Sequence, residues 1–345
     1  MNLALWLQRS ARIHGQRPAL ALGLEAVLDY TGLGEAAARC AGGLAARGLA
    51  AGDRVALFMD NAPDYLVGLW ACWWLGAVVV PINARLHGRE AGWICGHSGA
   101  RLCLVDARHA GELAPHAPPG CDLLADLAAL GRAAALPEPA PRGDDDAAWL
   151  FYTSGTTGRP KGVTLTQRNL RWASMAYVAT VQSVAAGDSC LHPAPLSHGS
   201  GLYHLPYVMN GGVNVVPASG GLDEAEFFAL AAHWRKASCF AAPTIVKRLA
   251  AHAQQHRPPL DGLATIVYGG APMYLADLEA ARDALGPHLA QIYGQGESPM
   301  TITVLPRSMI DDSAHPRWRQ RMASVGVAQP MVEVEIRSAD GKPLA

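Results

Sequence analysis

The stretch that decides the fold reads YTSGTTGRPKG and spans residues 152–162. It is rich in glycine and in hydroxyl side chains, and it lies between two strand-like segments, 147–151 and 163–166. Glycine adopts backbone dihedral angles that other residues resist, so the amide N–H groups of such a segment can converge on an anion. The hydroxyl groups add donors, and Lys161 adds a positive charge. The stretch therefore indicates a loop that holds a phosphate chain.

The spacing of this stretch does not fit a Walker A loop. That loop ends in Gly-Lys-Ser/Thr, whereas Lys161 follows Pro160 and precedes Gly162 here. From the residues alone, a solvated hairpin loop between two strands is the alternative to a phosphate site.

Composition indicates a globular protein with more than one domain or subdomain. The 345 residues are 50% hydrophobic, which is ample for a large core. The formal net charge of −1 gives no overall field that would attract nucleic acid or an anionic membrane. The cysteines number 7 and form no C-x-x-C pair, which favours free buried thiols in a reducing compartment. We therefore expect a cytoplasmic protein.

No segment is predicted to cross a membrane. The first residues lack the basic start and the long apolar run of a signal peptide. The most apolar stretch, 65–81, contains two glycines, ends at a proline, and reaches only the lower edge of the length that a bilayer requires. A buried helix that leads into a strand is the better interpretation.

Helical and strand patterns alternate along most of the chain, which predicts parallel α/β packing in two subdomains. The first subdomain covers 1–146, and its proline-rich end, about 111–146, is predicted to be a surface connection with one short helix at 122–136. The second subdomain covers 147–323. Helices are expected at 3–14, 34–48, 64–75, 168–181, 223–233 and 243–256. Strands are expected at 19–22, 26–28, 55–59, 77–81, 102–105, 149–152, 189–192, 212–216, 237–241 and 264–268.

The tail, 324–345, has a different sequence pattern from the rest of the chain. It is predicted to begin a β subdomain made of short segments, with a hairpin turn at Asp340-Gly341.

Residues 151–163 closely resemble the phosphate-loop signature of the adenylate-forming superfamily, which includes acyl-CoA synthetases, luciferases and peptide-synthetase adenylation domains. Three further motifs follow in the expected order: PLSHGSG (195–201), YGGAPM (268–273) and IYGQGESPM (292–300). The tail motifs VGVAQPMVEVEI and DGKPL, and the N-terminal stretch 52–83, also resemble the acyl-CoA synthetase branch. The resemblance covers essentially the whole chain.

The resemblance implies an α/β fold, namely the large N-terminal domain of the adenylate-forming fold. That domain has two mixed β-sheets layered with helices and a small β-barrel-like part. In the family, a Thr-Gly-Asp motif, a hinge and a small C-terminal domain with a catalytic lysine follow. None of these is found here, so we expect the C-terminal domain to be absent. Such a domain would bind nucleotide weakly and form adenylate poorly.

The resemblance also implies a two-step reaction that uses ATP, Mg²⁺ and coenzyme A. A carboxylate attacks the α-phosphate of ATP to give an acyl-adenylate, and a thiol then takes the acyl group. His198, Glu297 and Lys161 are the implied catalytic residues, with His198 steering the carboxylate. Mg²⁺ would be ligated by Glu297, with Thr153. The nucleotide would be bound by Thr153, Ser154, Gly155, Thr156, Thr157, Gly158, Lys161, Gly269, Gly270, Ala271, Pro272, Tyr293, Gly294, Gln295 and Gly296.

One position departs from the family motif. Where a threonine usually precedes the glutamate, this chain has Gly296 before Glu297. The change removes one hydroxyl near the α-phosphate, and it opens space toward the acyl pocket.

The acyl pocket is expected to have a mixed lining of aromatic, methionine and glycine residues. The expected residues are His198, Gly201, Tyr203, Tyr207, Met209, Tyr268, Gly269 and Met300. No basic residue in this set could pair with a second carboxylate, which favours a fatty or aryl monocarboxylic acid as the small-molecule partner.

Two other functional classes are alternatives to an acyl-CoA synthetase. A peptide-synthetase adenylation domain usually places an aspartate in the pocket, and the corresponding segment 237–243, ASCFAAP, offers no acid. A non-catalytic nucleotide-binding or interaction module is the other class, and a homodimer is the expected assembly to test. His192, His198 and His204 are evenly spaced, but this spacing has no helical or strand logic for a zinc site.

Overall fold

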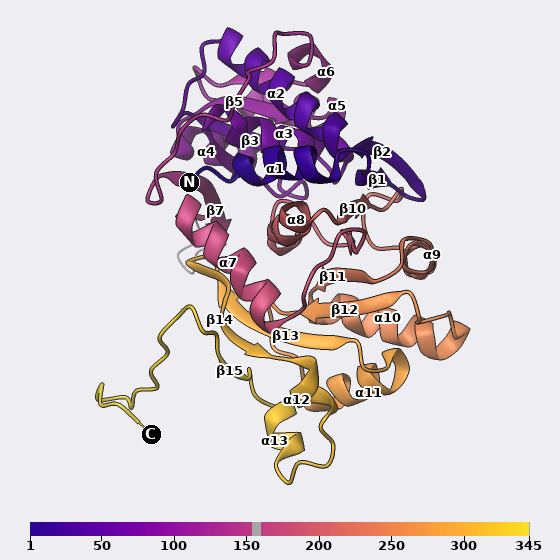
Figure 1. Ribbon diagram of the computed structural model, residues 1–345. Coiled ribbons are helices and arrows are strands. Elements are labelled where there is room, and N and C mark those ends of the chain that lie inside the picture. Colours follow the sequence, from indigo (N-terminus) through magenta and orange to yellow (C-terminus); the bar gives the residue numbers. More distant parts are fainter. Residues whose placement is uncertain (154–159, 345) are drawn as a thin grey trace.

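The structure is a computed structural model that describes residues 1–153 and 160–344 (Figure 1). A six-stranded sheet lies in the part of the molecule formed mainly by the first half of the chain. Its strands, in spatial order, are β6 (Asp122–Leu124), β5 (Ala100–Val105), β3 (Arg54–Phe58), β4 (Val78–Pro81), β7 (Ala147–Thr153) and β8 (Lys161–Thr166). All neighbours are parallel except β7 and β8, which form an antiparallel pair at one edge.

A nine-stranded sheet forms the second layer. Its strands, in spatial order, are β15 (Val327–Ala328), β14 (Ser298–Leu305), β13 (Leu289–Gln295), β12 (Leu263–Tyr268), β11 (Ala237–Ala241), β9 (Ser189–Leu191), β10 (Val213–Val216), β1 (Pro18–Leu22) and β2 (Glu25–Asp29). The central strands are parallel, and antiparallel strands lie at both edges. The prediction of two mixed sheets layered with helices is confirmed.

Helices pack on both sheets. They are α1 (Ala4–His14), α2 (Tyr30–Ala46), α3 (Pro63–Leu75), α4 (Gly88–Ser98), α5 (Ala107–Leu113), η1 (Ala114–His116), α6 (Leu127–Leu130), α7 (Gln167–Thr180), α8 (Gly199–Asn210), α9 (Glu224–Trp234), α10 (Pro243–His256), α11 (Leu275–Leu285), α12 (Arg307–Asp311) and α13 (Trp318–Met322). Every residue of α3 from Tyr65 to Leu75 is buried, as expected for a core helix that leads into β4. Within the described ranges, no helix combines the length and the apolarity needed to span a membrane.

The predicted subdomain boundary at residue 146 does not separate the two sheets. β7 and β8 follow that residue in sequence, yet they complete the six-stranded sheet. Conversely, β1 and β2 lie near the start of the chain and join the nine-stranded sheet, where Leu20 pairs with Asn214 of β10. Hydrophobic periodicity finds the strands but carries no information about which sheet each strand joins.

The helix predicted at 122–136 is wrong. Residues 122–124 form β6, which extends the open edge of the six-stranded sheet through its pairing with β5. Only α6 is helical in this region, and its Leu130 backbone packs against α2, where a β-carbon on Gly43 would lie 2.5 Å from the Leu130 carbonyl oxygen. The pairing and this close approach are tertiary effects, and they override the local helical preference of the alanines.

The tail contains less regular structure than its sequence indicates. β15 is its one named strand among the described residues, and an isolated antiparallel bridge joins Arg337 to Pro343. The predicted turn is present between these two residues, because Gly341 has a φ of 83° and its N–H donates to the Ser338 carbonyl.

The cysteines are all buried and free, which confirms the expectation of buried thiols.

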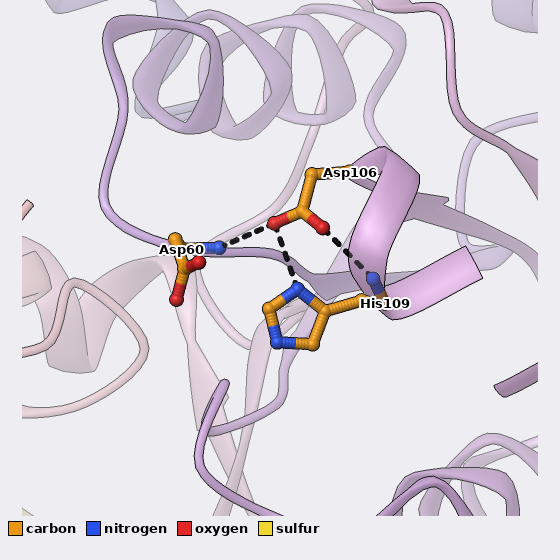
Figure 2. Close-up of side chains that lie close together, drawn as sticks. All are labelled: Asp60, Asp106 and His109. Atoms are coloured by element: carbon orange, nitrogen blue, oxygen red, sulfur yellow. Dashed lines mark hydrogen bonds and ion pairs between the residues drawn. The ribbon is translucent and has the colours of Figure 1, made fainter. Parts of the chain in front are cut away.

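A buried histidine network ties together the loops at one end of the six-stranded sheet (Figure 2). The Asp106 carboxylate accepts hydrogen bonds from the backbone N–H groups of Asp60 (3.0 Å) and His109 (2.9 Å), and from Nδ1 of His109 (2.7 Å). The other ring nitrogen of His109 lies 2.9 Å from the Ala84 carbonyl oxygen and 2.8 Å from the Arg108 guanidinium. The donor atoms of Asp60, Asp106 and His109 lie close enough to hold a metal ion. Protein atoms engage both nitrogens of His109, however, so the network is a structural clamp.

Candidate nucleotide and acid site

The two described ends of the glycine-rich stretch face each other across the β7–β8 pair. Thr153, the last residue of β7, is the register partner of Lys161, the first residue of β8. The antiparallel pairing brings the hydroxyl-bearing end and the cationic end of the loop together. The predicted phosphate contacts Ser154, Gly155, Thr156, Thr157 and Gly158 lie outside the described residues.

The turn between β13 and β14 lies directly against this loop base. A β-carbon on Gly296 would lie 2.8 Å from Cγ2 of Thr153, 3.3 Å from the Phe151 ring and 3.5 Å from Cγ2 of Val163. Glycine at this position thus permits the close approach of the two hairpins. The next residue, Glu297, is exposed at the tip of the turn. The turn that carries the predicted metal ligand therefore lies against the loop base, and Glu297 itself lines a separate hollow with Arg168 and Trp172.

A cavity of about 300 Å³ opens beside this junction. Its lining comes from both sheets and from the start of α8: Phe151, His198, Gly199, Leu202, Phe240, Gly270, Ile292, Gly294, Gln295, Gly296, Pro299 and Met300. None of these residues is charged, so the cavity suits a largely apolar ligand.

Half of this lining corresponds to residues singled out from the sequence, namely His198, Gly270, Gly294, Gln295, Gly296 and Met300. The residues that sequence reasoning missed are Phe151, Gly199, Leu202, Phe240, Ile292 and Pro299. Phe240 belongs to the segment ASCFAAP, which offered no acidic residue. An aromatic residue near the end of a parallel strand was the signal there, because ligands bind at the carboxyl ends of such strands.

His198 lies at the N-terminal end of α8, on the wall of the cavity. Its Nδ1 is 3.0 Å from Oγ of Ser197, and its ring meets the Phe151 ring edge-on at 5.6 Å. Burial lowers the pKa of His198, because the charged imidazolium loses hydration there. The uncharged imidazole therefore predominates at neutral pH.

The residues predicted for the adenine slot form an exposed rim. Gly269 is buried against β13, where a β-carbon would lie 2.7 Å from the Ile292 carbonyl oxygen. Gly270 has a φ of 82°, a left-handed conformation that glycine adopts without strain. Ala271 and Pro272 are exposed beyond it. Tyr293 is 38% exposed, and its hydroxyl accepts a hydrogen bond from Nε2 of Gln295 (3.2 Å).

Met300 occupies a strained position on the cavity wall. Its φ is 65°, in the left-handed region that a side chain other than glycine rarely adopts. The neighbouring backbone is tight, because a β-carbon on Gly294 would lie 2.5 Å from the Met300 amide nitrogen. Such strain persists only where the surrounding structure determines it, and it is frequent at functional sites.

The other residues predicted for the acyl pocket lie behind the cavity lining. Tyr203, Tyr207 and Tyr268 are each at most 1% exposed. Tyr203 stacks on Phe240, the Tyr207 hydroxyl lies 3.2 Å from that of Tyr177, and the Tyr268 hydroxyl donates to Gln291. Gly201 packs on the Leu196 carbonyl, and Met209 is half-buried near Arg9.

The other two evenly spaced histidines are held in the core by separate partners. The ring nitrogens of His192 lie 2.9 Å from Oγ of Ser200 and 3.2 Å from Oδ1 of Asn214. Nδ1 of His204 donates to the Gly201 carbonyl, and its ring stacks on Trp73. Burial lowers the pKa of His192 to about 4 and that of His204 to about 3.

These features define a class of protein. Two mixed sheets bring the base of a glycine-rich loop and the β13–β14 turn together beside a cavity whose described lining carries no charged residue, which is the arrangement of an α/β domain with a ligand site between its sheets. The chain belongs to the AMP-binding enzyme family, which matches residues 7–345.

Two curated relatives cover most of the chain. It is 33% identical to a feruloyl-CoA synthase from Amycolatopsis sp., over 99% of this chain and 67% of the relative. It is 31% identical to the long-chain-fatty-acid–CoA ligase FadD13 of Mycobacterium tuberculosis, over 91% of this chain and 62% of that protein. The chain thus spans roughly two thirds of the length of these relatives.

Solved structures agree with the fold. The N-terminal domain of FACL13 from Mycobacterium tuberculosis matches with a TM-score of 0.87 at 26% identity, covering 100% of this chain and 86% of that one. The o-succinylbenzoate coenzyme A synthetase of Bacillus subtilis, in complex with AMP, matches with a TM-score of 0.84 at 25% identity, covering 99% and 67%. The expected likeness to the N-terminal domain of acyl-CoA ligases is therefore confirmed.

Proposed function

We propose that this protein activates an apolar monocarboxylic acid with ATP and passes the acyl group to coenzyme A. The observation that carries the proposal is the junction of the two hairpins. Thr153 and Lys161 form the base of the glycine-rich loop, and Gly296, which lines the cavity and directly precedes Glu297, lies against Thr153. The names of the relatives, a feruloyl-CoA synthase and a fatty-acid–CoA ligase, support the same chemistry.

The proposed reaction depends mainly on neutralising negative charge on the phosphate groups of ATP. In the first step, a carboxylate oxygen of the acid forms a bond to the α-phosphorus of ATP, and the bond to the bridging oxygen breaks to release pyrophosphate. In the second step, the sulfur of coenzyme A, after losing its proton, attacks the acyl carbon and AMP leaves. Negative charge on the phosphoryl oxygens must be stabilised in the first step. Lys161 and the loop donors would provide this stabilisation.

The donor set at the junction fits a magnesium ion. Glu297 presents an exposed carboxylate, and no other described residue forms an ion pair with it. The Thr153 hydroxyl lies on the adjoining strand end. Mg²⁺ prefers such oxygen ligands and shares them with substrate phosphates. When bound, the ion would neutralise charge on the departing pyrophosphate.

His198 would orient the substrate carboxylate. It lines the cavity with its ring against that of Phe151, and its imidazole is neutral at pH 7 because burial lowers its pKa. A neutral ring can donate one hydrogen bond to the carboxylate without forming an ion pair that would weaken the nucleophile.

Nucleotide affinity tests the proposal. Calorimetric titration of the parent chain with ATP and magnesium should give binding, and Lys161→Ala should weaken it by about tenfold, the effect of one charge-assisted contact. The affinity for AMP, which lacks the β- and γ-phosphates, should fall less than the affinity for ATP in Lys161→Ala. Lys342→Ala is the matched control, since Lys342 is an exposed lysine that pairs with Asp340 in the terminal turn.

Equal ATP affinity for the parent and Lys161→Ala would instead support a non-catalytic module. Release of pyrophosphate from ATP, measured across a panel of acids, tests the chemical step separately.

A further inference from the structure

The deep wall of the cavity is built from stacked aromatic rings. Phe240, at the end of β11, lines the cavity, and its ring stacks on Tyr203 with centroids 5.2 Å apart and planes 27° apart. Tyr203 in turn meets Tyr177 edge-on at 5.3 Å, and Tyr177 lies beside Tyr207. These three tyrosines are at most 2% exposed. One face of Phe240 is therefore covered by a rigid block of core side chains.

Phe240 is also fixed at its edges. A β-carbon on Gly199 would lie 2.6 to 3.0 Å from three atoms of the Phe240 ring, and one on Gly270 would lie 3.8 Å from it. The ring thus sits between the start of α8 and the end of β12, and its contact with Gly199 depends on the absence of a side chain there. The backbone at Gly199 blocks movement of the ring toward α8. A ligand that enters the cavity meets this ring as a fixed surface.

The size of the cavity limits the ligand further. Its volume of about 300 Å³ lies at the low end of the roughly 300–1,000 Å³ range of small-molecule sites. Part of that space belongs to the nucleotide rim, since Gly294 and Gln295 share the lining. A compact tail fits the remainder, and the stacked rings of Phe240 and Tyr203 close one side of this half-open cavity.

We propose that the acid is a planar aromatic monocarboxylate, and that Phe240 is the residue that selects it by stacking on its ring. The inference rests on the proposed function and adds the substrate class. Offset or edge-on packing against Phe240 favours an aromatic ring over an alkyl chain. The described residues of the lining carry no charge, which disfavours a tail with a second charge, because that charge would lose its hydration without a partner among them.

The test compares three ligands that share one adenosine part. They are AMP, a cinnamoyl sulfamoyl-adenosine and a dodecanoyl sulfamoyl-adenosine, each titrated into the parent chain by calorimetry. We expect the cinnamoyl compound to bind about tenfold more tightly than the dodecanoyl compound. Phe240→Ala should open the wall and bring the two affinities to within about threefold, while AMP binding stays near the parent value.

Phe240→Leu is the conservative variant. It keeps most of the volume but removes the ring, so the cinnamoyl preference should fall without a gain for the dodecanoyl compound. A parent chain that binds the dodecanoyl compound as tightly as the cinnamoyl compound would overturn the inference and leave the proposed function standing. A cinnamoyl preference that survives in both Phe240 variants would overturn the role of Phe240. Failure of AMP and both analogues to bind would overturn the proposed function itself.

Discussion

Gly296 and Thr153 touch across the mouth of the site: a β-carbon on Gly296 would lie 2.8 Å from the Thr153 methyl carbon. The related motif usually carries a threonine at this position. The glycine removes the hydroxyl and also the β-carbon, which would be too close to Thr153. Two hairpins from different sheets meet here, and the missing side chain sets how closely they approach.

Restoring the threonine should therefore destabilise this protein. We expect Gly296→Thr to lower the free energy of unfolding by about 1–3 kcal/mol, the usual cost of overpacking. Thr153→Ser removes the opposing methyl group and keeps the hydroxyl, so the double variant should recover much of the loss. Urea unfolding of the parent, both single variants and the double variant measures the coupling. Strict additivity of the two changes would contradict the contact.

Two buried tyrosines allow a comparison between a hydroxyl group that forms a hydrogen bond and one that does not. The Tyr203 hydroxyl has no hydrogen-bond partner among the described residues, whereas the Tyr30 hydroxyl donates to the Gly212 carbonyl at 2.5 Å. Tyr203→Phe should change the free energy of unfolding by less than about 0.5 kcal/mol, or stabilise the fold, and Tyr30→Phe should cost about 1 kcal/mol. Thermal unfolding of both variants checks this. Equal losses would show that the Tyr203 hydroxyl is satisfied.

The clamp around Asp106 should make stability fall in acid. Burial favours the neutral carboxyl, but hydrogen bonds from the His109 and Asp60 backbone and from the His109 ring outweigh it, so the pKa of Asp106 is lowered. The stabilisation is present above the unfolded pKa of about 3.9 and is lost as pH falls through the folded value. Asp106→Asn should cost about 2 kcal/mol at pH 7. That difference should shrink below pH 4, as urea titrations at both pH values would reveal.

His192 should also make the free energy of unfolding fall in acid, and this fall should begin at a higher pH than the one due to Asp106. Burial lowers its pKa to about 4, so between the unfolded value of about 6.5 and pH 4 the unfolded chain binds a proton that the folded chain does not. Its share of the stability is present above pH 6.5 and declines by about 1.4 kcal/mol per pH unit below that. His192→Gln, which can still bond to Ser200 and Asn214, should flatten the stability curve between pH 6 and 5. An unchanged slope would contradict the assignment.

Local patterns predicted most of the secondary structure, and tertiary contacts account for what they missed. The helix over residues 64–75 and the strands of the central sheets follow from runs of apolar residues. β6 was mistaken for part of a helix because its strand character depends on pairing with β5. The sheet membership of β1 depends on β10, which lies far away in sequence. Periodicity within a short window holds neither kind of information.

The site was predictable where backbone chemistry has a sequence signature. Glycines and the expected order of motifs point to the loop base and to the β13–β14 turn, which the structure brings together. The apolar wall was less visible, because Phe240 has the same sequence appearance as any core phenylalanine. Tyr203 and Tyr207 are expected near the acyl pocket, but both side chains are buried in the core behind its lining. Which face of α8 meets the cavity is decided by packing.

The parallel pairing of β1 with β10 has a consequence for folding during synthesis, because the two strands lie far apart in the sequence. Leu22 pairs with Val216, so roughly 200 further residues must leave the ribosome before the first hairpin can find its neighbour. At about 5–20 residues per second, that delay lasts on the order of 10–40 s. During that interval the apolar strand β1 keeps one hydrogen-bonding edge open, and an open edge of this kind can pair with other chains.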